Sequence, residues 1–145
     1  MIVSHVQTDG DPRTTGAFMH GMVERYWRDM VPYAHLTVTE VFDRIKNIPF
    51  KADPQEAEVL QRPMYTMQGN GYGGDCDDKA IALASWCRAV GLPYQFVAVR
   101  RADMPDLHHV FCRIYIRNRW VHADPTYNFN ALGREREPYA EYVVI

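Results

Sequence analysis

Apolar residues in the first part of the chain repeat at the spacing of helices. This spacing predicts three helices, which run from Thr14 to about Met30, from Thr37 to Ile48 and from Asp53 to Gln61. Thr14 and Thr15 are suited to cap the first helix, and Pro32 should break the chain after it. Methionine and aromatic side chains at helical spacing are usually core residues, so we interpret residues 1–62 as a helical N-terminal part.

Residues 63–145 carry a different pattern, in which one apolar helix is followed by segments rich in β-branched and aromatic residues. Met64 to Gly74 is predicted to be a glycine-rich loop, and the helix after it ends at Gly91-Leu92-Pro93. The predicted strands are Phe96–Val99, His109–Ile116, Trp120–Asp124 and Tyr139–Ile145, with a tight turn at Arg117-Asn118-Arg119. We therefore predict a single α+β domain over residues 1–145, with helices packed on an antiparallel sheet of three or four strands.

The composition indicates which kinds of partner and which cellular compartment to expect. A net charge of −2 and the lack of a basic run argue against nucleic acid as the main partner. The first residues lack the basic start and unbroken apolar core of a signal peptide, and no apolar stretch reaches about eighteen residues. We therefore expect no membrane partner and a cytoplasmic location. Three cysteines speak against a disulfide framework and fit a reducing compartment.

Cys76 stands where the glycine-rich loop turns into a helix. A cysteine in the first helical turn lies near free backbone N–H groups, at the positive end of the helix dipole. This position lowers a thiol pKa and supplies donors for an oxyanion, as a thiolate nucleophile requires. Cys87 and Cys112 fall instead at core positions of the predicted helix and strand. Their spacing does not match a zinc site.

The predicted hairpin brings a histidine and a carboxylate together. His109 and Asp124 fall at corresponding ends of its two strands, where opposed Cβ atoms lie about 4.5–5.5 Å apart. Alternation sends His108 to the opposite face. His122 has the same parity as Asp124, but we interpret it as a partly exposed strand residue. A Cys–His–Asp constellation results if the helix of Cys76 packs its first turn against this end of the sheet.

Taken in order, these blocks resemble the transglutaminase-like superfamily, which shares the papain-like cysteine protease architecture. The resemblance rests on GDCDDKA (Gly74 to Ala80), Arg88 to Pro93, Phe96 to Val99, His109-Val110-Phe111 and the run from Trp120 to Thr126. It extends from Gly69 to Tyr127 and implies that residues 63–145 form a catalytic core. It also implies that Cys76 is the nucleophile, His109 the general base and Asp124 the group that orients the imidazole.

The resemblance implies a cysteine hydrolase, a thiol protease or amidase that cleaves a peptide or protein substrate through a thioester acyl-enzyme. The alternative is a true transglutaminase, in which a lysine amine resolves the same intermediate. The residues do not separate these two reactions, and the small size favours hydrolysis. Short GDCDDKA proteins also resemble ones encoded among bacteriophage or prophage structural genes. A non-catalytic, virion-associated interaction protein on the same scaffold is therefore a third alternative.

Further residues are expected to complete the site around the cysteine. By its similarity to papain-like enzymes, Gln68 is a candidate side-chain donor to the oxyanion, although its interval to Cys76 departs from their spacing. Tyr72 and Trp120 are candidates to line the substrate groove.

The aspartates beside the cysteine allow two interpretations. In the first, no cofactor is present, Asp75 or Asp77 caps the helix, and Asp78 faces Lys79 or a basic loop. In the second, Asp75 and Asp77 hold a calcium ion. This interpretation is implied by the resemblance to calcium-binding proteases of the superfamily, which have a similar acidic motif.

Overall fold

The computed structural model of the protein describes residues 12–52, 59–68, 73–134 and 138–145. Its helices are α1 (Pro12–Tyr26), the 3₁₀ helix η1 (Trp27–Tyr33), α2 (Val38–Lys46), α3 (Pro63–Met67) and α4 (Cys76–Val90). Its strands are β1 (Tyr94–Arg100), β2 (His109–Ile116), β3 (Arg119–Ala123) and β4 (Glu141–Val144). The predicted helix at Asp53 begins within residues 53–58, which lie outside the described residues.

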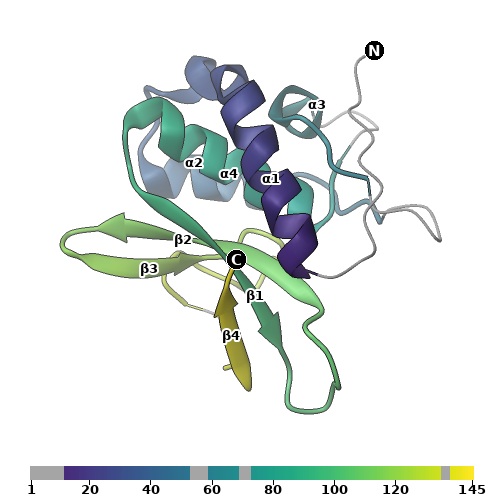
Figure 1. The fold of residues 1–145 in the computed structure, drawn as a ribbon. Coiled ribbons are helices and arrows are strands. Elements are labelled where there is room, and N and C mark those ends of the chain that lie inside the picture. The colour runs from purple at the N-terminus through teal and green to yellow at the C-terminus, as the bar shows by residue number, and fades with distance from the viewer. Residues whose placement is uncertain (1–11, 53–58, 69–72, 135–137) are drawn as a thin grey trace.

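A four-stranded antiparallel sheet, in the order β3-β2-β1-β4, carries the helices on one face (Figure 1). The sheet residues that join the main core with the helices are Phe96, Ala98, Val110, Cys112, Ile114 and Ala123. On the other face, Val97, Val99 and Phe111 form a smaller buried cluster, against which Tyr139 packs. The prediction of an α+β fold with N-terminal helices packed on an antiparallel sheet is confirmed.

Helix α4 lies at the centre of the molecule. It contacts the other helices as well as β1 and β2, so nearly all of its side chains are buried. On the sheet side, Cys112 of β2 donates from Sγ to the backbone carbonyl of Ala80, at 3.2 Å. The helix ends at Gly91, whose φ of +81° is the left-handed conformation that glycine adopts without steric penalty. Because α4 is held on several sides, the core sets the direction in which its first turn points.

The N-terminal helix differs from the prediction at both of its ends. α1 begins at Pro12, so Thr14 and Thr15 lie within it and do not cap it. Proline is favoured at a first helical position because its missing N–H would have had no helical partner there. Tyr26, with a φ of −124°, separates α1 from η1, and Pro32 lies inside η1. The predicted cap and the predicted break at Pro32 are therefore both wrong.

The next two segments show one success and one failure. Thr37 caps α2 through a reciprocal pair of hydrogen bonds with Glu40, at 3.1 and 2.9 Å, and the helix ends at Lys46. The segment from Met64 to Gly74, predicted as a loop, begins inside α3. Pro63 starts that helix, again at a position that suits proline.

The hairpin of β2 and β3 follows the predicted pattern. β2 has the predicted bounds, and its turn places Arg117 and Asn118 at φ values of 53° and 64°, as a type I′ turn requires. β4 pairs with β1 as an antiparallel edge strand, and the carbonyl of the following Ile145 lies 3.1 Å from Nε2 of His20 on α1. Within the described residues, none of the helices has the length and apolar character needed to cross a lipid bilayer.

Candidate active site

A reciprocal cap fixes the first turn of α4. Asp75 Oδ1 accepts the backbone N–H of Asp78, and Asp78 Oδ2 accepts the backbone N–H of Asp75, each at 3.2 Å. Asp78 Oδ1 also accepts the N–H of Gln61 at 2.9 Å, which ties the preceding segment to the helix. Asp75 is thus the helix cap, as one of the two predicted options. Both carboxylate oxygens of Asp78 thus accept backbone N–H groups, from Asp75 and Gln61.

The thiol of Cys76 is surrounded by acidic groups. Its Sγ donates to Asp77 Oδ1 at 3.6 Å. Burial raises the pKa of Cys76 well above its usual value, and the carboxylates of Asp77, Asp75 and Asp124 raise it further, while the Val110 backbone opposes them. The lowered pKa expected from the helix position alone is therefore wrong for the free protein. Desolvation is the largest cause of the raised pKa, and the carboxylates of Asp77 and Asp75 follow it.

His109 and Asp124 form a buried pair. His109 Nε2 lies 2.7 Å from Asp124 Oδ2, and both side chains are almost fully buried. The second carboxylate oxygen, Oδ1, accepts the backbone N–H of Thr126 at 3.1 Å, and the side chain of Asn130 donates to the Asp124 carbonyl at 3.2 Å. Asp124 is thus fixed by its own turn. When Nε2–H donates to this carboxylate, Nδ1 is the ring nitrogen left to act as a base.

The register of the hairpin explains the geometry of this pair. The paired residues of β2 and β3 end at Cys112 opposite Ala123, so Asp124 continues the register opposite Phe111. The prediction that His109 lies directly opposite Asp124 is therefore off by two residues. The two side chains make a diagonal contact across the strand pair. Neighbouring His108 is exposed, and its ring lies 6.4 Å from that of Tyr139.

Tyr127 lies near the cysteine, the histidine and the aspartate. Its ring centroid lies 5.3 Å from that of His109. Burial raises the pKa of Tyr127, and so do the nearby Asp124 and Cys76. The structure thus brings His109 and Asp124 into contact and places Cys76 in the same region, with its thiol bonded to Asp77. Sequence reasoning did not single out Tyr127, although it directly follows the Asp-Pro-Thr block.

Comparison with known proteins shows the family and the fold of the chain. The model of the transglutaminase-like superfamily matches residues 25–125, a span that contains the cysteine, the histidine and the aspartate. The chain belongs to the transglutaminase-like superfamily. A crystal structure of a candidate cysteine protease from Cytophaga hutchinsonii shares the fold, with a TM-score of 0.52 at 18% sequence identity. The similarity covers 74% of this chain but 40% of that one. No curated protein matches the sequence significantly.

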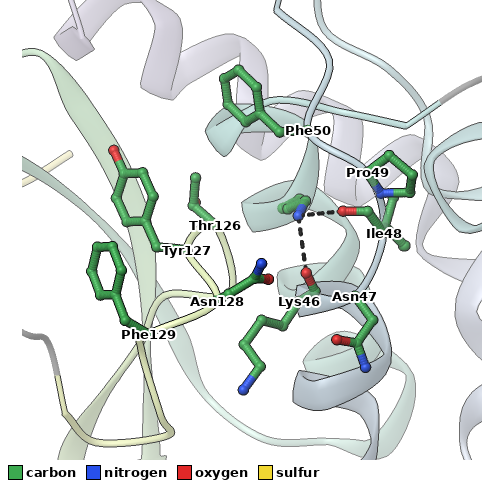
Figure 2. Close-up of a pocket in the computed structure, with 10 residues that line it drawn as sticks. Lys46, Asn47, Ile48, Pro49, Phe50, Thr126, Tyr127, Asn128 and Phe129 are labelled. Atoms are coloured by element: carbon green, nitrogen blue, oxygen red, sulfur yellow. Dashed lines mark hydrogen bonds between the residues drawn. The ribbon is translucent and has the colours of Figure 1, made fainter.

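The transglutaminase-like core contains a buried lysine in the turn after its cysteine. Lys79 is 1% exposed, and its Nζ donates to the backbone carbonyls of Ile48 at 2.7 Å and Lys46 at 3.4 Å (dashed lines in Figure 2). Burial lowers the pKa of Lys79, and nearby Asp124 opposes that shift. These two bonds fasten the end of α2 to the first turn of α4. This role of Lys79 was not predicted, because both bonds join residues that are far apart in the chain.

The remaining predicted site residues are Gln68, Tyr72 and Trp120. Gln68 is exposed at the end of α3, whereas Gln61 donates from Nε2 to Thr66 Oγ1 and to the carbonyl of Gly73, both at 2.9 Å. Tyr72 lies outside the described residues. Trp120 packs on Tyr115 beside the hairpin turn, at the opposite end of β3 from Asp124.

The carboxylates that the structure describes near Cys76 do not form a calcium site. Asp75 and Asp78 direct their oxygens to backbone N–H groups of the cap. Within residues 12–52, 59–68, 73–134 and 138–145, no group of three or more His, Cys, Asp or Glu side chains is placed to hold a metal ion. The acidic residues of this transglutaminase-like chain are therefore best explained as helix capping and as modulators of the thiol pKa.

Proposed function

We propose that the protein is a cysteine-dependent hydrolase of peptide or amide bonds. Cys76 is the nucleophile, His109 the general base, and Asp124 the residue that positions the imidazole. The observation that supports this most is the buried contact of 2.7 Å between His109 Nε2 and Asp124 Oδ2, in the same region as a cysteine that opens a helix. A buried carboxylate that orients a histidine is the arrangement used to activate a nucleophile.

The raised pKa of the thiol determines how the first step runs. Because burial and carboxylates favour the protonated thiol, attack requires a base at the moment of reaction. As Sγ of Cys76 bonds to the acyl carbon, Nδ1 of His109 takes the thiol proton. Asp124 stabilises the imidazolium that forms. The backbone N–H of Cys76, at the start of α4, is the proposed donor to the oxyanion.

The second half of the reaction returns the proton. The acyl C–N bond breaks, the leaving amine takes the proton from His109 Nδ1, and a thioester on Cys76 remains. Water then attacks the thioester and gives its proton to Nδ1. The C–S bond breaks, the carboxylic acid leaves, and Cys76 regains its proton. In acyl transfer an amine would take the place of this water.

The proposal is tested first without a substrate, by the rate at which iodoacetamide alkylates Cys76 at neutral pH. His109→Ala should slow this alkylation at least about tenfold, since a positioned base contributes at least that much to proton transfer. His108→Ala is the matched control, because it removes the adjacent but exposed histidine and should leave the rate unchanged. An equal loss from both variants, or from neither, would overturn the assignment.

Turnover is then measured with dye-labelled casein in the presence of dansyl-cadaverine. Release of dye peptides that is lost in Cys76→Ala supports hydrolysis. Incorporation of the amine without release of peptides would favour acyl transfer instead. If neither product forms and Cys76 is alkylated only at the rate of an ordinary thiol, the result would count against catalysis.

A further inference from the structure

A cavity of about 450 Å³ opens next to the proposed active site. It lies between residues 46–50, at the end of α2, and residues 126–129, in the loop after β3, with Lys79 also in its lining (Figure 2). Its volume is within the range that binds small ligands or side chains. The proposed function has not used this cavity.

Tyr127 forms a wall between the cavity and the catalytic histidine. It lines the cavity and also lies 5.3 Å, between ring centroids, from His109. Thr126, another lining residue, donates its backbone N–H to Asp124 Oδ1 at 3.1 Å. A peptide whose scissile bond reaches the imidazole would therefore place a neighbouring residue at this cavity.

Aromatic rings stand along the opening. Tyr127 and Phe129 stack with ring centroids 5.1 Å apart and an angle of 9° between their planes. Phe50 stands across the opening from them in Figure 2. Phe50 and Phe129 are 59% and 55% exposed, which leaves most of their apolar surface available to a bound group. These rings would favour an apolar side chain at the rim.

The polar part of the lining contains hydrogen-bond donors and the positive charge of Lys46. It comprises the amines of Lys46 and Lys79, the amides of Asn47 and Asn128 and the hydroxyl of Thr126, and none of the described lining residues is acidic. Thr126 is 7% exposed, and its Oγ1 has no hydrogen-bond partner among the described residues. A buried hydroxyl without a partner is costly unless a ligand or water completes it.

Lys46 is the charge best placed to meet a ligand. Its Nζ reaches the loop after β3 and donates to the Asn130 carbonyl at 3.3 Å. Its ion pair with Asp43 is long, at 3.6 Å, and Asp43 is 53% exposed, so the pair neutralises Lys46 only weakly. Lys46 and Thr126 both line the cavity, so an anionic group that enters it has an ammonium group and a hydroxyl among its possible partners.

We propose that this cavity is the subsite for a carboxylate-bearing residue of the acyl substrate, flanked by an apolar residue that packs on Tyr127 and Phe129. The assignment rests on the proposed function for its place next to the scissile bond. The carboxylate has two sources in a peptide, an acidic side chain or a free C-terminus. Both offer the same oxygens to the same donors.

The test measures binding to the full-length Cys76→Ala protein, which cannot turn the probes over. Three probes differ only in charge: acetyl-Phe-Glu-amide, acetyl-Phe-Gln-amide, and acetyl-Phe-Gln with a free C-terminus. Affinities come from titrations followed by backbone amide NMR. At least one charged probe should bind about fivefold or more tightly than the neutral one, as a partly buried ion pair contributes. The tighter of the two identifies the source of the carboxylate.

Variants locate the binding. Lys46→Gln should remove the preference for charge, whereas Arg88→Gln should keep it. Arg88 is the matched control because its ion pair with Glu24, also 3.6 Å long, lies outside the cavity lining. Phe129→Ala should weaken all three probes about fivefold. Phe18→Ala, which removes a comparably exposed ring from α1, should weaken none of them.

The outcomes separate this inference from the proposed function. Equal binding of charged and neutral probes, or a charge preference that survives Lys46→Gln, overturns the subsite. If the cavity prefers charged probes but His109 does not increase the reactivity of Cys76, the subsite proposal stands and the hydrolase proposal is overturned. If Cys76 hydrolyses peptides but the cavity binds charged and neutral probes equally, the hydrolase proposal stands and the subsite proposal is overturned.

Discussion

His109 and Asp124 meet at 2.7 Å although they are not opposed in the sheet. The register of β2 and β3 places Asp124 opposite Phe111, two residues further along β2. The contact forms because Asp124 has left the strand and is held by Thr126 and Asn130 in the turn that follows. This turn, and not the ladder of the hairpin, aims the carboxylate at Nε2.

We predict that Asp124→Asn lowers the kcat/KM of hydrolysis by about 10³–10⁴-fold, as an amide in the orienting position does elsewhere. An amide NH₂ facing Nε2 would force the ring proton onto Nδ1, the atom that has to accept the thiol proton. The same change should lower the pKa of Cys76, because the Asp124 charge raises it. Asp103→Asn, at an exposed loop carboxylate, is the control.

A loss of hydrolysis combined with a thiol that ionises at lower pH distinguishes positioning from mere destabilisation. A variant that loses hydrolysis while its thiol alkylates at lower pH has lost its base and kept its fold. Loss of both activities together with a lower melting temperature would make Asp124 a structural residue of the turn.

We predict that Asp77→Asn lowers the pKa of Cys76. After burial, the Asp77 carboxylate is the largest cause of the raised pKa, and its Oδ1 accepts the thiol at 3.6 Å. Removing this negative charge favours the thiolate, so the thiol should ionise at lower pH. The measurement is the rate of iodoacetamide alkylation against pH. A midpoint that stays in place would mean that burial alone sets this pKa.

Local signals in the sequence were sufficient for much of the fold. The start of α4 follows from glycines, an Asx cap and an apolar helix in immediate succession, and the bounds of β2 follow from its composition. The choice of His109 over His108 rested on the alternation of a strand and on the spacing of the family motif. In the structure His109 is buried and His108 is exposed. Each of these inferences depends on residues that are near one another in the chain.

What the sequence did not predict depends on contacts between distant segments. Lys79 bonds to Ile48 across 31 positions, and Gln61 bonds to Asp78 across 17. The thiol pKa of Cys76 was expected to fall because the helix dipole is visible in the sequence. Burial, a tertiary property, is the largest cause of the raised pKa, and the carboxylates of Asp77 and Asp75, which are adjacent to Cys76 in the chain, raise it further.

We predict that the protein loses stability as the pH rises from about 9 to about 12, in part through Cys87. Burial raises the pKa of Cys87 from 9.0 to about 12 in the folded state. The folded protein therefore holds this proton in a range where the unfolded chain releases it. Stability from this group is fully present below pH 9 and is lost as the pH approaches 12.

Cys87→Ala should flatten this alkaline loss, measured as the free energy of unfolding by urea at several pH values. Val41→Ala is the matched control, since it also truncates a fully buried side chain but removes no titrating group. It should lower stability at every pH and leave the slope unchanged. An unchanged slope in Cys87→Ala would contradict the prediction.

We predict opposite effects from the same substitution at two glycines. Gly73 has a φ of +60°, and a Cβ there would lie 2.5 Å from the carbonyl oxygen of Pro49. That carbonyl accepts the N–H of Gly74 at 3.1 Å and so holds the loop before Cys76. Gly73→Ala should therefore cost about 2 kcal/mol or more and lower the melting temperature by about 4–8 °C.

Gly21 lies inside α1, where an added Cβ meets nothing within 4 Å. Gly21→Ala should therefore stabilise the protein by up to about 1 kcal/mol, because alanine loses less backbone entropy in a helix. The loop before Cys76 would then be shown to need glycine for its conformation and its close contact, and not for freedom of movement. If Gly73→Ala were as well tolerated as Gly21→Ala, the loop would have a different conformation from the one described, and the placement of Cys76 would have to be revised with it.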